Sequence, residues 1–252
     1  MNMRDRIEPS GSCQKQTCSR CSLSRICLPV SLDEADIGTL GRLVQHQPML
    51  KRGESLFREG DGFRSLYAVR AGSLKSVTTT ATGDHQITGF HLPGELVALD
   101  AINRWAHPGS AIALETTSVC ELPFEKLEQL AANIPDLQRQ LLRLMSQEIA
   151  DDQDMLFTMA RRNADERLAI LLLSFSERFQ QRGLSGTRFR LSMARSDLGN
   201  YLGLAPETTS RVFRRFQDQG WIQAEGREVE LLAVDALAEL AGQGASDPAR
   251  TG

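Results

Sequence analysis

The stretch ARSDLGNYLGLAPETTSRVFRRFQDQGWIQAEGREVELLAV, residues 194–234, has the pattern of two short helices followed by a β-hairpin. Pro206 can open the second helix, because a proline at the first helical position loses no hydrogen bond there. Leu198, Leu202 and Leu204 are apolar, and Gly203 lies between the two helical patterns. Two helices joined by a glycine-containing turn of this length are typical of a helix-turn-helix.

The second of these helices has two different faces. Val212 and Phe216 are four residues apart, so they lie on one face and can pack the helix against its own domain. Glu207, Ser210 and Arg211 fall at i, i+3 and i+4 on the other face, close to the helix N-terminus. Side chains in these positions reach base edges when such a helix enters the major groove of DNA.

The segment GWIQAEGREVEL predicts a two-stranded wing with Gly226 at its turn. Arginine is concentrated around it: residues 161–230 hold 12 arginines and 9 acidic residues. Arginine suits bidentate contacts with phosphates and guanine edges, and we expect Arg214 and Arg215 to join Arg211 at DNA. The alternative is an ordinary helical hairpin with a solvated polar face.

The middle of the chain predicts a small β-structure followed by long helices. Between about 48 and 125, short segments rich in β-branched residues alternate with glycine-centred turns, which indicates a β-barrel or sandwich. After Pro123 the pattern is helical, with an interruption near Pro135. Apolar spacing of 3, 4, 3, 4 and 3 then predicts a coiled-coil seam between two copies of the chain, made of Leu142, Met145, Ile149, Asp152, Leu156 and Met159. The alternative is a helix packed on its own barrel.

Three of the chain's five cysteines lie in one short polar segment, CSRCSLSRIC. The N-terminus has no apolar signal-peptide region, and no stretch is apolar for long enough to span a membrane, so we expect a soluble cytoplasmic protein. Such a compartment is reducing, and clustered cysteines there favour metal or redox chemistry over disulfides. Spacing alone leaves an iron–sulfur cluster and a zinc ion both open, because CxxC also occurs in zinc sites.

A β-roll, a dimer helix and a winged helix-turn-helix together resemble the cyclic-AMP receptor protein superfamily. Within it, residues 13–242 are similar to the fumarate and nitrate reduction (FNR) branch, in QITGFHLPGELV, ALETTSVCE, RLMSQEI, DQDM and NYLGLAPETTSRV. The resemblance implies an α+β fold with five parts. These are a cysteine-rich segment (1–30), a cyclic-nucleotide-binding-like β-roll (31–134), a dimerisation helix (135–162), a winged helix-turn-helix (163–242) and a disordered tail (243–252).

In that branch three N-terminal cysteines and one from the β-roll bind a 4Fe–4S cluster. Cys18, Cys21, Cys27 and Cys120 match those positions, which leaves Cys13 as a spare thiol. Soft sulfur ligands and a count of four suit such a cluster. A zinc-structured or cluster-free regulator is the alternative.

The resemblance also implies a mechanism and some departures from the wider superfamily. We expect a transcription activator, not an enzyme, whose intact cluster favours a homodimer on TTGAT-N4-ATCAA-like sites. Oxygen dismantles the cluster by way of a 2Fe–2S form. RNA polymerase is contacted through the β-roll and residues 181–191. Cyclic AMP is not expected as a ligand, because Gly109 precedes Ser110 where nucleotide-binding members carry an arginine.

Overall fold

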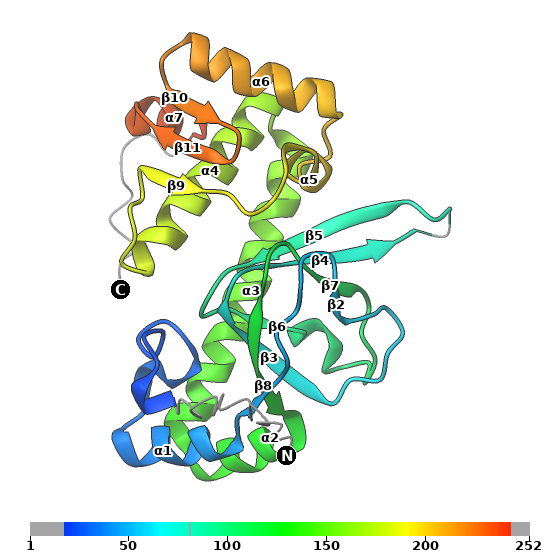
Figure 1. Cartoon of the computed structure of the whole chain (residues 1–252), viewed down its shortest axis with the longest axis vertical. Coiled ribbons are helices and arrows are strands. Elements are labelled where there is room, and N and C mark those ends of the chain that lie inside the picture. Colours follow the sequence, from blue (N-terminus) through cyan, green and yellow to red (C-terminus); the bar gives the residue numbers. More distant parts are fainter. Residues whose placement is uncertain (1–17, 81, 243–252) are drawn as a thin grey trace, which may run out of the picture.

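The computed structural model describes residues 18–80 and 82–242. The expectations for Cys13 and for the tail at 243–252 therefore lie outside the described residues. In the described part, no helix is long and apolar enough to cross a membrane. The helices and strands are arranged as a lower β-structure, a long helix and an upper C-terminal unit (Figure 1).

The N-terminal segment folds into short turns before its first helix. A 3-10 turn, η1 (Cys18–Arg20), is followed by a second, η2 (Leu28–Ser31), and by helix α1 (Glu34–Leu43). Asp33 caps α1 by accepting a hydrogen bond from the backbone N–H of Asp36 at 2.8 Å. Helix α1 was not predicted from the sequence, and Leu40 is its one buried residue.

The β-roll consists of two four-stranded antiparallel sheets. One has the order β1-β8-β3-β6 and the other β2-β7-β4-β5. The segment 110–123 forms two strands in different sheets, because the chain turns between them. The strand bounds are β1 (Gln45–His46), β2 (Ser55–Phe57), β3 (Ser65–Ala71), β4 (Leu74–Thr79), β5 (His85–His91), β6 (Leu96–Val97), β7 (Ser110–Ala113) and β8 (Ser118–Pro123). A short turn, η3 (Leu99–Ala101), follows β6.

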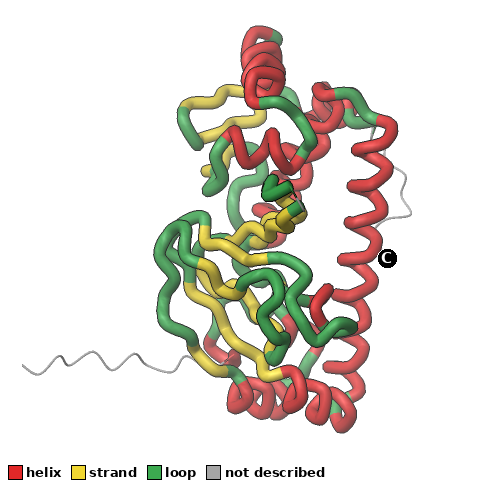
Figure 2. Tube along the Cα trace, turned by 90° about the vertical axis from the view of Figure 1, so that its right-hand side faces the viewer, coloured by secondary structure: helices red, strands yellow, loops and turns green. Residues whose placement is uncertain are grey.

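Two helices follow the β-roll. Helix α2 (Phe124–Asn133) ends at Ile134, and α3 (Pro135–Arg161) begins with proline at its first position, as the sequence indicated. The start of α3 is anchored by Leu137, which is fully buried in the core beneath the β-roll. The rest of α3 runs along one side of the molecule (Figure 2).

The C-terminal unit is a winged helix-turn-helix. Its elements are α4 (Ala164–Gln181), β9 (Arg188–Arg190), α5 (Arg195–Tyr201), α6 (Pro206–Asp218), β10 (Ile222–Glu225), β11 (Glu228–Leu231) and α7 (Val234–Leu240). The strands form one antiparallel sheet, β10-β11-β9, with Gly226 at positive φ in the wing turn. Its core is continuous with the β-roll, since Ile87, Phe90 and Leu92 of the roll belong to the same buried cluster. The predicted α+β architecture is confirmed.

Candidate functional site

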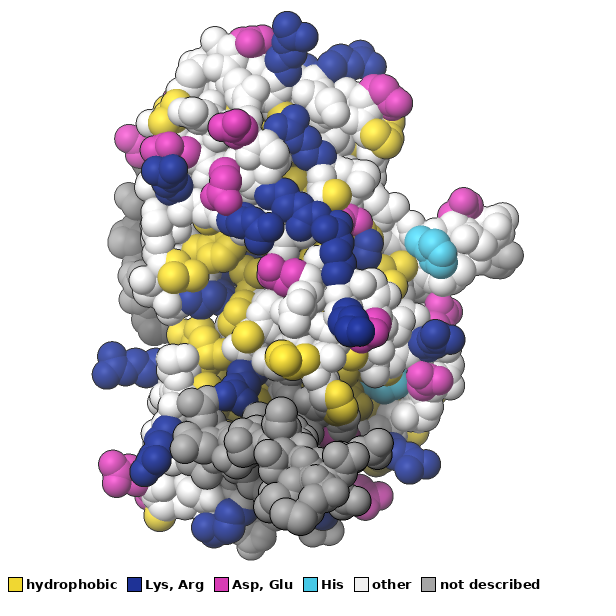
Figure 3. All heavy atoms as spheres, in the orientation of Figure 1, with side chains coloured by type: hydrophobic (Ala, Val, Ile, Leu, Met, Phe, Trp, Pro, Cys, Tyr) yellow, Lys and Arg dark blue, Asp and Glu magenta, His cyan; other side chains and the backbone are white. Residues whose placement is uncertain are grey.

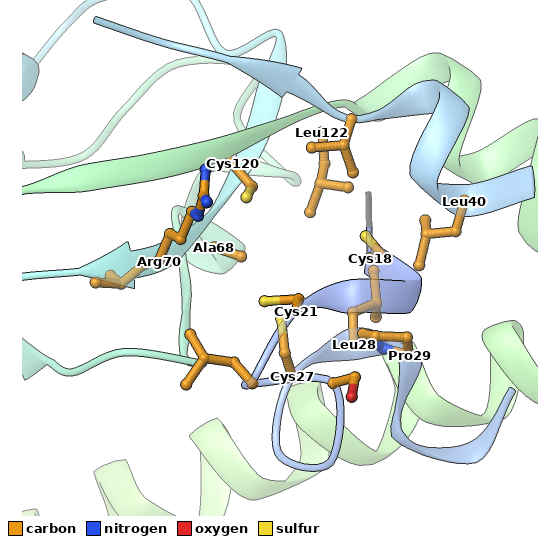
Figure 4. A pocket seen from close by; sticks show the side chains of 14 residues that line it. Cys18, Cys21, Cys27, Leu28, Pro29, Leu40, Ala68, Arg70, Cys120 and Leu122 are labelled. Carbon is orange, nitrogen blue, oxygen red and sulfur yellow. The ribbon is translucent and has the colours of Figure 1, made fainter. Parts of the chain in front are cut away.

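Four cysteines from two distant parts of the chain line one pocket. Cys18, Cys21 and Cys27 come from the N-terminal segment, and Cys120 comes from β8. Figure 4 shows the N-terminal cysteines facing the strands that carry Cys120 and Arg70. The remaining lining is Leu23, Ser24, Leu28, Pro29, Leu40, Val44, Ala68, Val69, Arg70 and Leu122. The structure therefore brings together all four cysteines that the sequence singled out.

Backbone turns hold the three N-terminal thiols on one side of the pocket. The N–H of Cys21 donates to the carbonyl of Cys18 at 3.2 Å, and the N–H of Cys27 donates to Leu23 at 2.9 Å. On the other side, Cys120 is held between two strands, paired with Ala68 of β3 and His46 of β1. The N-terminal cysteines therefore share the pocket with a cysteine whose position the sheet fixes.

The pocket disfavours free thiolates. Burial raises the pKa of Cys27 to about 12 and that of Cys120 to about 11, and neighbouring thiols add to both shifts. A bound metal removes this cost, because its positive charge deprotonates coordinating thiols outright. Among the described residues, no three His, Cys, Asp or Glu side chains are grouped to hold a metal ion. The four thiols share a pocket, and their sulfur-only donor set fits an iron–sulfur group.

The second candidate site is the exposed face of α6. Val212 and Phe216 are buried at 1% and 0% exposure, as their spacing indicated. Glu207, Ser210 and Arg211 lie on the exposed side. Figure 3 shows Lys and Arg side chains over the upper, C-terminal unit, with a row of them across the middle of this face and others scattered over the lower half.

Close packing of α5 on α6 orients this face. Gly199 of α5 lies against Thr209 of α6, and a Cβ on Gly199 would come within 2.5 Å of the Thr209 hydroxyl oxygen. Thr209 is fully buried, and its hydroxyl donates to the carbonyl of Ala205. The guanidinium of Arg195 lies 4.7 Å from the ring centre of Phe213, which adds a cation–π contact between the two helices.

The arginines of α6 have different surroundings. Arg215 pairs with Asp165 at the start of α4, with 2.5 Å between Nη1 and Oδ2. Arg214 is 83% exposed and lies 4.0 Å from Asp218. Arg211 and Arg215 both line a groove between the start of α4 and α6, whereas Arg214 does not. Arg214 is therefore better placed than Arg215 for the phosphate contact that the sequence suggested for both.

Comparison with known proteins identifies both units. Residues 166–240 match the model of the Crp-like helix-turn-helix domain, and residues 48–133 match that of the cyclic nucleotide-binding domain. The transcriptional activator protein Anr of Pseudomonas protegens is 54% identical over 89% of this chain and 92% of that protein. The chain belongs to the FNR branch of the CRP/FNR superfamily.

A second relative and a solved structure agree with this assignment. The fumarate and nitrate reduction regulatory protein of Escherichia coli K12 is 48% identical over 92% of this chain and 93% of that protein. The solved structure of FixK2 from Bradyrhizobium japonicum superposes with a TM-score of 0.72 at 28% identity, over 81% of this chain and 98% of that one. The relatives are transcription regulators and not enzymes, so this FNR-branch chain is a DNA-binding transcription regulator.

Sequence reasoning missed the pocket residues that carry no sulfur. Leu40 and Val44 of the α1 region and Arg70 of β3 line the cysteine pocket, yet no local motif marks them. They reach the pocket only through the packing of α1 beside η1 and the pairing of β3 with β8. Three-dimensional packing is the only signal that locates them.

Proposed function

We propose that this protein is an oxygen-responsive transcription activator that binds one 4Fe–4S cluster per subunit. The observation that carries the proposal is the single pocket lined by Cys18, Cys21, Cys27 and Cys120. When bound, the cluster supplies iron–thiolate bonds that are sensitive to oxygen. The cysteines would then attach the N-terminal segment to β8, and loss of the cluster in air would release the segment from β8.

Release of the N-terminal segment would affect α3, because the two pack directly against each other. η2 lies against α3, and Leu28 of η2 and Leu137 of α3 are buried in the same core. Leu142, Ile149 and Leu156 leave a row of apolar side chains exposed along α3, at 59%, 59% and 71%. Covering this row with the same helix of a second copy gives a homodimer with two α6 helices. A cluster that fixes η2 supports the position of α3 that this pairing needs.

The proposed operator is TTGAT-N4-ATCAA, in which two half-sites are separated by four base pairs. In each half, Glu207, Ser210 and Arg211 face base edges, and Arg214 meets a phosphate. RNA polymerase contact is assigned to the β-roll and to residues 181–191, and the cytoplasm is the place of action. These finer assignments rest on similarity to the FNR branch.

Cyclic AMP has no role in this proposal. The hydroxyl of Ser110 already accepts a hydrogen bond from the N–H of Glu59 at 2.9 Å. Gly109 lies so close to β4 that a Cβ there would be 2.8 Å from the carbonyl oxygen of Val77. Arginine at position 109 would clash, so this corner cannot supply the cation that a cyclic phosphate needs without rearrangement.

An absorption spectrum of protein purified without oxygen tests the proposal. We expect broad absorbance near 400 nm, about four irons and four sulfides per chain, and loss of both absorbance and operator binding in air. A zinc-structured regulator is the competing candidate, since four thiols also suit zinc. Stoichiometric zinc with no visible absorbance would support that candidate and refute the iron–sulfur proposal.

A further inference from the structure

One carboxylate of the β-roll joins the roll to the C-terminal unit. Glu95 lies in the loop between β5 and β6, and it accepts hydrogen bonds from Arg178 of α4 and from Arg182, the C-cap residue of that helix. Arg178 donates from Nε and Nη2 to the two carboxylate oxygens at 2.9 and 2.6 Å. Arg182 donates from Nη2 at 2.6 Å, and the N–H of Leu92 donates at 2.9 Å. We refer to Glu95, Arg178 and Arg182 as the Glu95 hub.

The two arginines also bind the backbone of the roll. Arg178 donates to the carbonyl of Phe90 at 2.6 Å, and Arg182 donates to that of Pro93 at 2.8 Å. Arg182 is only 6% exposed, while Arg178 and Glu95 are 22% and 29% exposed. Bidentate, partly desolvated contacts of this kind fix relative orientation as well as distance.

The loop that carries Glu95 is itself held on its other side. The N–H of Gly94 donates to the backbone carbonyl of Val69 at 2.8 Å, and the N–H of Val69 donates to the backbone carbonyl of Glu95 at 2.9 Å. Gly94 has φ +96°, and a Cβ there would lie 2.9 Å from Ile26, next to Cys27. The hub therefore rests on a loop packed between the cysteine segment and the sheet, with little room to shift.

A second set of contacts joins the roll directly to the helix-turn-helix. Asn200 of α5 accepts from the N–H of Ile87 at 2.6 Å and donates to the carbonyl of His85 at 2.8 Å. Lys75 of β4 pairs with Asp197 of α5 at 2.7 Å. Attachment at α4 and at α5 restrains rotation of the unit about either point.

We propose that Glu95, Arg178 and Arg182 are positioning residues for DNA recognition. They hold α6 at a fixed orientation to α3 and thereby set the operator spacing that the dimer accepts. This inference rests on the proposed function, because spacing has meaning only for a dimer on a two-part operator. The physical link is that half-site spacing follows from the separation of the two recognition helices. The hub lies at the β-roll, away from the exposed face of α6 that carries Glu207 and Arg211.

Two measurements on the full chain test the proposal with Glu95→Gln, which keeps the size of the side chain and removes its charge. Glu128→Gln is the matched control, because Glu128 is exposed on α2. The first measurement is the distance distribution between spin labels at Glu54 and Gln223, attached through non-cysteine chemistry, in air and without DNA. The second is the affinity of cluster-loaded protein for operators whose half-sites are separated by three to six base pairs.

We expect a narrow label distance in the parent and in Glu128→Gln, and a broadened one in Glu95→Gln. The preference for the four-base-pair spacer should fall by about tenfold in Glu95→Gln, while intact half-sites are still preferred over scrambled ones. If Glu95→Gln does not fold, Arg178→Lys replaces it in both measurements. This variant retains the charge but not the bidentate geometry, and it should lose part of the preference for the four-base-pair spacer. Unchanged distance width and unchanged spacer preference would overturn the proposal. A parent that binds no operator would refute the proposed function, and the label distance would then decide the hub's role alone.

Discussion

Single cysteines give the most direct residue-level prediction. Serine at position 18, 21, 27 or 120 should abolish cluster loading and anaerobic operator binding, because each change removes one of four thiolates. Cys13→Ser should leave both nearly intact. Iron and sulfide content per chain, with operator affinity measured anaerobically, checks this. Loss of the cluster in Cys13→Ser with retention in Cys18→Ser would show that the ligands are assigned wrongly.

Arg211 and Arg214 should fail in different ways. Arg211→Ala should cost about 1–3 kcal/mol at one base pair and relax selection there, since arginine reads guanine through O6 and N7. Arg214→Gln should weaken binding to every sequence alike and reduce the salt dependence, because a phosphate contact carries no sequence information. Binding to an operator series at several salt concentrations separates the two. An Arg211→Ala protein with unchanged selectivity contradicts the reading role of α6.

His91 should make stability depend on pH. Burial lowers the pKa of His91 to about 4, with a further contribution from Arg178 and an opposing one from Glu95. Its Nε2 lies 2.8 Å from the hydroxyl of Ser76. The imidazole of His91 therefore binds a proton more readily in the unfolded chain than in the folded one. Its contribution to the free energy of unfolding is complete above pH 6.5 and is lost as the pH falls toward 4.

Urea unfolding at several pH values measures this effect. The parent should lose up to about 3 kcal/mol more than His91→Gln between pH 6.5 and 4. His46→Gln changes an exposed histidine and should follow the parent. Equal slopes for the parent and His91→Gln would rule out the half-buried neutral imidazole as the cause.

At the scale of elements, the helices with strong punctuation were predictable. Pro206 and Pro135 begin α6 and α3, and Gly226 forms the turn of the wing, because each residue has a backbone preference that a sequence displays. Helix α1 buries only Leu40 fully, so its sequence shows no clear apolar stripe. Two-residue strands such as β1 are too short to show a period. In the Glu95 hub, Arg178 and Arg182 follow Glu95 by 83 and 87 positions in the sequence, so no local pattern could reveal their contact. The fourth cysteine was assigned to the pocket by resemblance, not by periodicity.

The crossing of α5 and α6 depends on a glycine within α5. Gly199→Ala would place a methyl group 2.5 Å from the hydroxyl oxygen of Thr209 and 3.1 Å from the carbonyl of Leu204. We expect destabilisation of about 1–3 kcal/mol and weaker operator binding, because this buried contact cannot yield without moving α6. Gly38→Ala in α1 meets nothing within 4 Å and should stabilise by about 0.5–1 kcal/mol. Denaturant unfolding of both variants checks the signs, and a stabilising Gly199→Ala would contradict the packing argument.

For the whole molecule, the balance between monomer and dimer depends on the exposed side of α3. The seam residues Leu142, Ile149 and Leu156 are exposed, whereas Met145 and Met159 are partly covered. Asp152 is also exposed and lies between Ile149 and Leu156. Desolvation, and next the charges of Asp152 and Asp151, raise the pKa of Glu148 to about 7, so the two aspartates oppose further negative charge on this part of α3.

Asp152→Ala should therefore favour the dimer without any cluster. In a symmetric pairing of α3, the two Asp152 carboxylates approach each other and lose water, and both effects oppose association. Removing the charge should increase the dimer fraction in air and give operator binding there. Asp154→Ala removes an exposed acid from the same helix but off the seam, and it should behave as the parent does. Sedimentation of the three aerobic proteins tests this, and equal monomer fractions for the parent and Asp152→Ala would show that this aspartate does not hold the two copies apart.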